Sequence, residues 1–124
     1  MKFVCIGYFS PSLSASHTTH EIETVMEKCK PHLDQFYATG NVILDVGVDN
    51  DSYRIFREKG IQHTQEVLLQ ADKMIGSITV IDAENAQDAL EIARLHPAVQ
   101  IAEGEYLGWE IKVQPLHHYT ATVC

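Results

Sequence analysis

The chain has 124 residues and a mass of 13.9 kDa, enough for one hydrophobic core but too few for two, so we expect one domain over residues 1–124. Hydrophobic residues make up 45% and charged residues 21%, which is ordinary globular usage and argues against disordered, collagen-like and disulfide-dense classes. Seventeen acidic residues against nine basic ones give a net charge of -8, which argues against nucleic acid or an anionic membrane as a partner.

The three cysteines, Cys5, Cys29 and Cys124, are an odd number at spacings that fit neither a zinc ribbon nor a CxxC redox pair. We therefore expect reduced thiols and a cytoplasmic location. The apolar run over residues 3–9 is too short for a transmembrane helix and lacks a small-residue cleavage site. We expect it to form a strand.

The strand expected over residues 2–9 is apolar at both alternating sets of positions, as in a central strand covered on both faces. A Ser-rich loop over residues 10–16 follows. Thr18 and Glu21 then match the capping-box pattern, which predicts a helix that begins near Thr19.

In this helix, apolar residues recur every three or four positions as far as Tyr37, and Gly40 marks the end. Pro31 lies inside the stripe, which resumes in phase after it, so we expect a kink; two helices broken at this point are the alternative. Residues 41–48 predict the next strand.

The second half of the chain predicts a hairpin and then a strand, a helix and a strand. Residues 52–58 and 61–69 flank Lys59 and Gly60, which indicates a two-residue turn. The three later elements are expected over residues 75–81, 86 to about 96, and 106–114.

This order predicts an α+β fold, namely a ferredoxin-like split βαβ sheet with an inserted β-hairpin. Two helices cover only one face of a four-stranded sheet, so we expect a homodimer to hide the other face. The polar side chains expected on that other face, beside a small ligand or in the dimer contact, are Tyr8, Ser77, Thr79, Glu110 and Lys112.

Two stretches of the chain carry a family pattern. The first runs from Pro31-His32-Leu33 through Phe36 and Gly40 to an apolar strand that ends at Gly47. The second consists of Ile75-Gly76-Ser77, Ile81-Asp82-Ala83, the Ala-rich segment 89–93, His96-Pro97-Ala98 and residues 109–116. In these residues the chain resembles the YCII-related family, including its DGPF-type branch, of small dimeric α+β barrel proteins. The DGPF signature is missing, since Gln65-Glu66-Val67-Leu68 stand in its place, so the chain looks like an outlying member.

His32 is the catalytic candidate among the seven histidines. It lies about 60° from Cys29 on the helical wheel, at the edge of the apolar stripe, so we expect its ring to be half-buried. The resemblance implies that a histidine here pairs with an aspartate in an acid/base site, and Asp45 is the nearest plausible carboxylate. Such a partner fixes the imidazole tautomer and raises its basicity. The alternative is a boundary histidine satisfied by backbone or water, with Asp45 at the surface.

The resemblance implies a lyase-type activity, because the few assigned members include one that eliminates halide from chlorinated hydroxyquinols. We therefore expect a cofactor-independent lyase or isomerase that acts on a small molecule, with aromatic compounds among the candidates. A non-catalytic dimeric module that binds a small ligand is the alternative. No phosphate-binding loop occurs, so no nucleotide cofactor is expected. No metal site is expected either, since the remaining histidine pairs have no chelating geometry: His17 with His20, and His117 with His118.

Overall fold

The computed structural model describes residues 1–66 and 72–122, and within them the chain forms six strands and five helices. The strands are β1 (Lys2–Phe9), β2 (Val42–Gly47), β3 (Ser52–Arg57), β4 (Ile61–Glu66), β5 (Met74–Asp82) and β6 (Glu110–Pro115). The helices are α1 (Pro11–Ser14), α2 (Thr19–Ala38), α3 (Ala86–Ala93), α4 (Pro97–Gln100) and α5 (Gly104–Leu107).

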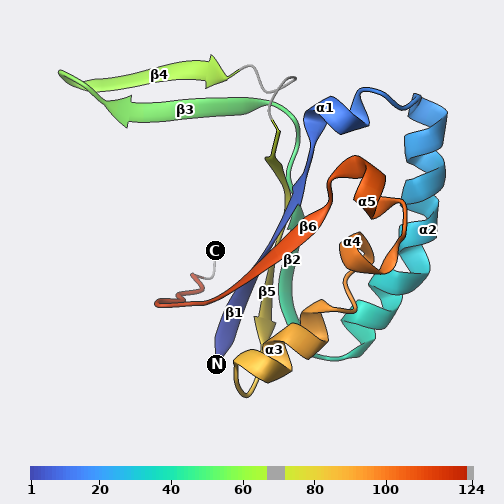
Figure 1. The fold of residues 1–124 in the computed structure, drawn as a ribbon. Coiled ribbons are helices and arrows are strands. Elements are labelled where there is room, and N and C mark those ends of the chain that lie inside the picture. Colours follow the sequence, from blue (N-terminus) through green and yellow to red (C-terminus); the bar gives the residue numbers. More distant parts are fainter. Residues whose placement is uncertain (67–71, 123–124) are drawn as a thin grey trace.

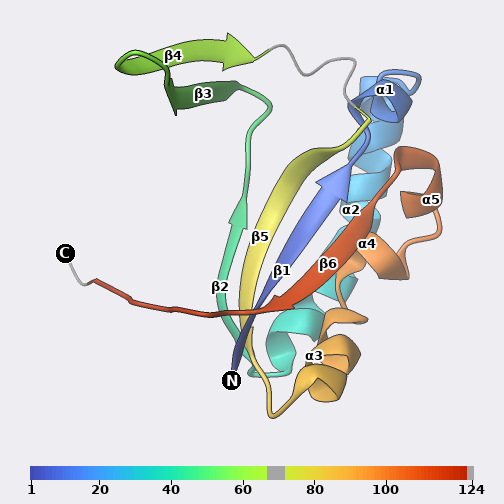
Figure 2. The ribbon, with the colours of Figure 1, turned by 60° about the vertical axis from the view of Figure 1, so that its left-hand side comes forward.

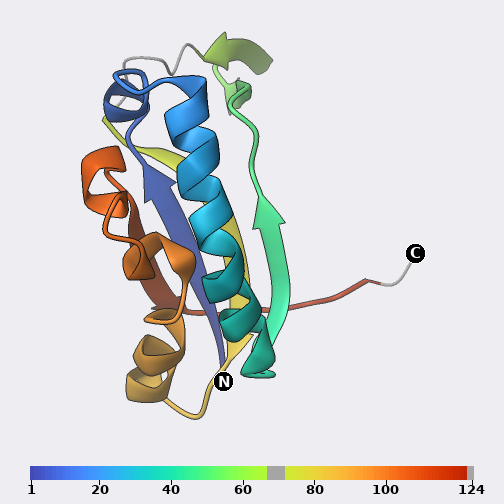
Figure 3. The same cartoon turned by 90° about the vertical axis from the view of Figure 1, so that its right-hand side faces the viewer.

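Four strands form an antiparallel sheet in the order β2-β5-β1-β6, and β3 and β4 form a separate two-stranded sheet. The helices lie on one side of the larger sheet (Figure 1), and α2 runs lengthwise along it (Figure 3). The expected α+β class, the ferredoxin-like strand order and the inserted hairpin are confirmed. Among residues 1–66 and 72–122, no helix lies on the opposite face of the sheet.

The core lies between the sheet and α2. Alternate residues of β1 point to opposite faces, so Phe3 and Cys5 point towards the helices and are only 2% and 1% exposed. Phe36 of α2 and Ile81 of β5 pack with them and are fully buried. Burial raises the pKa of the Cys5 thiol to about 11, so this cysteine is an unreactive packing residue.

Local signals explain the helix boundaries. Thr18 accepts a hydrogen bond from the amide of Glu21, whose side chain accepts one from the amide of Thr18, so the capping box is confirmed. The helix is continuous from Thr19 to Ala38 and includes Pro31, so the alternative of two helices is wrong.

Three expectations in the connecting segments are corrected. The loop over residues 10–16 contains α1, because the Ser10 hydroxyl caps a turn that begins with Pro11. The last strand begins at Glu110, four residues later than expected, because residues 104–107 are helical and left-handed Gly108 ends that helix. The hairpin connection has three residues, 58–60, rather than two, and residues 67–69 of its second predicted strand lie outside the described residues.

No helix in residues 1–66 or 72–122 has the length and apolar character that a bilayer crossing requires.

The left-handed backbone at Gly108, between α5 and β6, can be tested by substitution. Its φ is +70°, and an added Cβ would lie 2.7 Å from the Ser10 Cβ. We expect Gly108→Ala to lower the free energy of unfolding by about 2 kcal/mol, because left-handed backbone is unfavourable for alanine and Ser10 must move. Urea denaturation measures the change. Gly47→Ala is the matched control, since no atom lies within 4 Å of its added Cβ; equal losses in the two variants would contradict the prediction.

Candidate active site

Asp45 lies on β2, the edge strand of the sheet, opposite Thr79 of β5. The Thr79 hydroxyl, which is fully buried, donates a hydrogen bond of 2.8 Å to Asp45 Oδ1. The hydroxyl of Tyr37, near the C-terminal end of α2, donates to Oδ2. The half-buried carboxylate is therefore held from both sides, by the sheet and by the helix.

The contact with Asp45 changes the pKa of the Tyr37 phenol. Its hydrogen bond to Asp45 raises the Tyr37 pKa to about 12, with smaller contributions from burial and from the charges of Asp45 and Asp34. Tyr37 therefore keeps its proton at neutral pH and acts as a donor to the carboxylate.

His96 is a buried histidine at the start of α4. It is 9% exposed, and its ring packs edge-on against Phe36 with 5.3 Å between centroids. Burial lowers the His96 pKa, and the negative charge of Asp45 opposes that effect. The Ala98 amide donates a 3.0 Å hydrogen bond to His96 Nδ1 and so caps α4. His96 is therefore neutral at pH 7, with its proton on Nε2.

His32 is half-buried, as expected from its place on the wheel. It lies about 40° from Lys28 and about 140° from Tyr37 around α2. Lys28 reaches Glu103, at 3.1 Å, on one flank of the helix, whereas Tyr37 reaches Asp45 on the other.

The structure therefore does not place His32 and Asp45 in contact. Within the described residues, no hydrogen bond or ion pair joins them. Their dyad stays a prediction, and it needs a ligand or a water molecule that bridges the two side chains.

Two polar residues lie on the face opposite to the one expected. Thr79 is paired with Cys5, and Ser77 with Gly7, so both point towards the helices rather than towards the open sheet face. The other three expected residues belong to the open face, where Lys112 Nζ lies 5.3 Å from the centroid of the Tyr8 ring. Glu110 forms an ion pair of 3.4 Å with Lys73.

Sequence reasoning missed the roles of Tyr37 and Thr79 as hydrogen-bond partners of Asp45, and of His96 as the cap of α4. A signal for His96 exists, because a polar side chain directly before Pro97 is a typical helix cap. For Thr79 the signal is absent, because its contact depends on the strand register.

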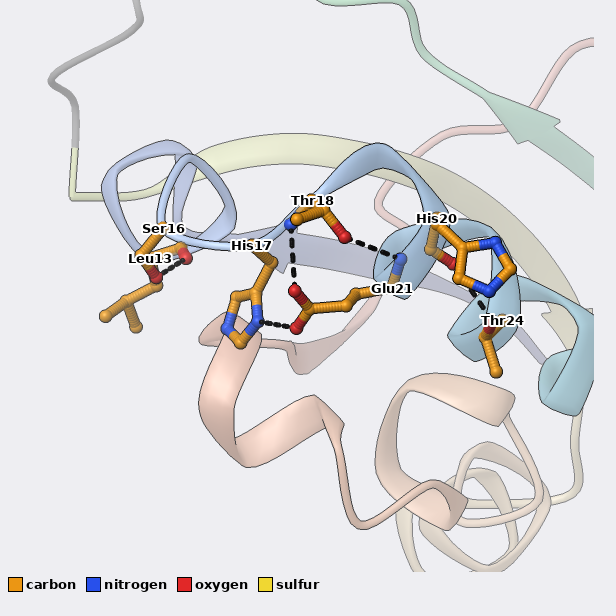
Figure 4. A network of polar contacts seen from close by, with 7 residues as sticks. All are labelled: Leu13, Ser16, His17, Thr18, His20, Glu21 and Thr24. Atoms are coloured by element: carbon orange, nitrogen blue, oxygen red, sulfur yellow. Dashed lines mark hydrogen bonds and ion pairs between the residues drawn. The ribbon is translucent and has the colours of Figure 1, made fainter.

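A second group of polar residues lies where α2 begins. His17 Nδ1 is 3.1 Å from Glu21 Oε2, and the hydrogen bonds to His17 and Thr18 lower the Glu21 pKa (Figure 4). The His20 ring does not point towards the contact between His17 and Glu21 (Figure 4). Within residues 1–66 and 72–122, no group of three or more His, Cys, Asp or Glu side chains is placed to hold a metal ion.

A cavity of about 200 Å³ adjoins this group, between α2 and α5. Apolar atoms of Ile22, Val25 and Leu107 line it. The two carboxylates at its edge already have partners, Glu21 with His17 and Glu103 with Lys28. The cavity therefore offers mainly apolar contacts, with the paired His17 and Glu21 at its edge.

The structure is thus a small α+β domain in which the Asp45 carboxylate lies between α2 and the edge strand β2. A model of the YCII-related domain matches residues 1–113. The chain belongs to this family, which confirms the resemblance. No curated protein matches the chain.

The coupling between Tyr37 and Asp45 can be tested by titration. We expect Asp45→Asn to lower the Tyr37 pKa from about 12 towards its ordinary value of 10.0, because the neutral amide no longer opposes a phenolate. NMR of ¹³C-labelled tyrosine measures this pKa, and a Tyr37→Phe variant assigns the signal. Asp34→Asn is the control and should have a smaller effect. A Tyr37 pKa that is unchanged in Asp45→Asn would contradict the assignment.

His96 predicts a pH dependence of stability. The imidazole has a pKa near 6.5 in the unfolded chain and a lower one in the folded chain. The contribution of His96 to the free energy of unfolding is therefore fully present above pH 6.5. It is lost as the pH falls towards the folded-state pKa, because the unfolded chain binds the proton at a higher pH than the folded chain does. We expect His96→Asn, which keeps a capping oxygen, to lose less stability than wild type between pH 7.5 and pH 5.5 in urea denaturation, on the scale of about 1 kcal/mol. Parallel profiles would exclude His96 as the titrating group; His20→Asn is the control.

Proposed function

We propose that this YCII-related protein is a cofactor-independent lyase or isomerase that acts on a small molecule by acid/base chemistry. Compounds with an aromatic ring are the first candidates. The observation that supports the proposal best is the arrangement around Asp45, where a half-buried carboxylate is oriented by hydrogen bonds from Thr79 and Tyr37. A fixed carboxylate and a neutral imidazole are the groups that proton abstraction next to a leaving group requires.

In this proposal, His32 is the general base and Asp45 orients it or its substrate. His32 is half-buried on α2, and a substrate that contacts both side chains would bring the base and the carboxylate to the same molecule. His96 is the second candidate for the base, since burial lowers its pKa and keeps the imidazole neutral at pH 7.

A non-catalytic small-ligand-binding module is the second candidate function, and one observation favours it. Both oxygens of Asp45 already accept hydrogen bonds, from Thr79 and Tyr37. A carboxylate satisfied in this way is a weaker base, and it serves equally well as part of a rigid binding surface.

We also propose that the protein is a homodimer. The open sheet face carries Leu44 and Val46, which are 47% and 40% exposed, beside half-buried Ile6 and Ile78. A contiguous apolar surface of this kind is typical of a subunit contact. We propose further that residues 1–124 act as one domain and that the protein is cytoplasmic, which the buried free thiols of Cys5 and Cys29 suit.

A thermal-shift screen tests the function. The panel consists of small hydroxylated aromatic compounds, including chlorinated hydroxyquinols, and the proteins are wild type, His32→Ala and Asp45→Asn. We expect a compound that stabilises wild type to lose its effect in Asp45→Asn. For a halogenated compound, an ion-selective electrode should record halide release, reduced about 100-fold or more in the variant that lacks the base.

The exposed residue His20 supplies the control variant, His20→Ala, which should behave as wild type. Binding without release of product would favour the ligand-binding module. If a compound is bound and turned over equally by wild type, His32→Ala and Asp45→Asn, the site is elsewhere. Loss of turnover in His96→Asn alone would transfer the role of base from His32 to His96.

A further inference from the structure

The β3-β4 hairpin stands away from the rest of the chain (Figures 1 and 2). It forms its own sheet and shares no ladder with the four-stranded one. A lone two-stranded hairpin is marginally stable in water, because it has no second layer on which to bury side chains. This segment therefore needs a surface that residues 1–66 and 72–122 of the same chain do not provide.

The hairpin has two different faces. Residues that are directly opposite in the ladder share a face, and alternate residues belong to opposite faces. One face therefore carries Tyr53, Ile55 and Ile61, with exposed fractions of 65%, 75% and 75%. On the other face Phe56 is half-buried and has the Arg54 guanidinium 4.0 Å from its ring centroid. The apolar groups left without contacts are thus gathered on one face.

The position of the hairpin indicates what covers it. It projects on the side of the four-stranded sheet that carries no helices, and the C-terminal tail projects on the same side from the far end of the strands (Figures 1 and 2). Any body that lies on the open sheet face is therefore flanked by these two segments. In a two-fold symmetric dimer, the hairpin and tail of each subunit would therefore contact the other subunit.

The charge of the hairpin suits an acidic partner. Residues 52–66 hold three of the nine Lys and Arg residues and two of the seventeen Asp and Glu residues, so the hairpin is net +1 and the rest of the chain is net -9. A second copy of this chain presents such an acidic body. Attraction between opposite charges favours the approach of the hairpin to it.

The area required by a stable dimer also favours a contribution from the hairpin. Four strands about 4.8 Å apart and about 20–26 Å long give the open sheet a footprint of about 400–500 Å². Stable interfaces bury about 800 Å² per partner. One face of the hairpin adds about 200 Å², and the surface that receives the partner's hairpin adds the same. The sum then reaches the size that a stable dimer needs.

We propose that the β3-β4 hairpin is a dimerisation arm whose Tyr53, Ile55 and Ile61 face packs on a second copy of the chain. This inference rests on the homodimer proposed above and specifies which segment stabilises it. It is independent of the chemistry proposed at Asp45. The arm leaves the interior of its own subunit untouched, so its removal weakens association and not folding.

The experiment compares two double variants that add the same charge to opposite faces of the hairpin. Ile55→Asp with Ile61→Asp alters the apolar face, and Gln62→Asp with Thr64→Asp alters the other one. Light scattering and sedimentation velocity across a dilution series give the dimer dissociation constant. We expect the first pair to raise this constant at least about tenfold, and the second pair to change it less than about threefold.

The outcomes distinguish failure of the dimerisation-arm proposal from failure of the homodimer proposal. A wild-type mass of 13.9 kDa at every concentration overturns the homodimer and the arm together. A wild-type dimer that both double variants leave equally stable overturns the arm alone. Hydrogen exchange of wild type is the second measurement, in case a variant does not fold: amides of β3 and β4 should be protected in the dimer and exposed on dilution, and equal exchange in both states overturns the arm.

Discussion

Burial of Phe36 against the central strand is the contact on which the fold and the candidate site both depend. Its ring is fully buried with Phe3 and Cys5 of β1, and burial of a side chain of this size contributes about 1.5–3 kcal/mol. The same ring supports His96 edge-on, and the next residue in the chain, Tyr37, reaches Asp45. One packing contact thus fixes the helix, the buried imidazole and the phenol relative to the edge strand.

Tyr37 and His96 are both neutral at pH 7, for different physical reasons. Burial holds His96 neutral, while the hydrogen bond to Asp45 holds the proton on Tyr37. One negative charge therefore lies among neutral donors, which keeps the cost of its partial burial low. Asp45 is a preoriented carboxylate, because hydrogen bonds position both of its oxygens.

The sequence predicted most features that depend on neighbouring residues, such as helix caps and strand bounds. It predicted few of the contacts that depend on which residues of adjacent strands are paired. The Thr18 and Glu21 capping box and the bounds of β1 were predictable, because each signal lies within a few residues. Thr79 was assigned to the wrong face, since β5 is apolar or small on both sides and only its pairing with Cys5 shows the direction. The contact between Tyr37 and Asp45 needs both the end of α2 and the start of β2, and His96 became a cap only because α3 ends at Ala93.

The hairpin is inserted between two strands that are neighbours in the sheet. β2 ends where β5 begins, so Gly47 faces Ser77 and the Val48 amide donates to the Gly76 carbonyl at 2.9 Å. The two ends of the insertion therefore meet whatever its length, and changes in a loop of this kind cost little free energy. The length and the side chains of this segment can therefore change while the sheet hydrogen bonds and the surroundings of Asp45 stay as they are.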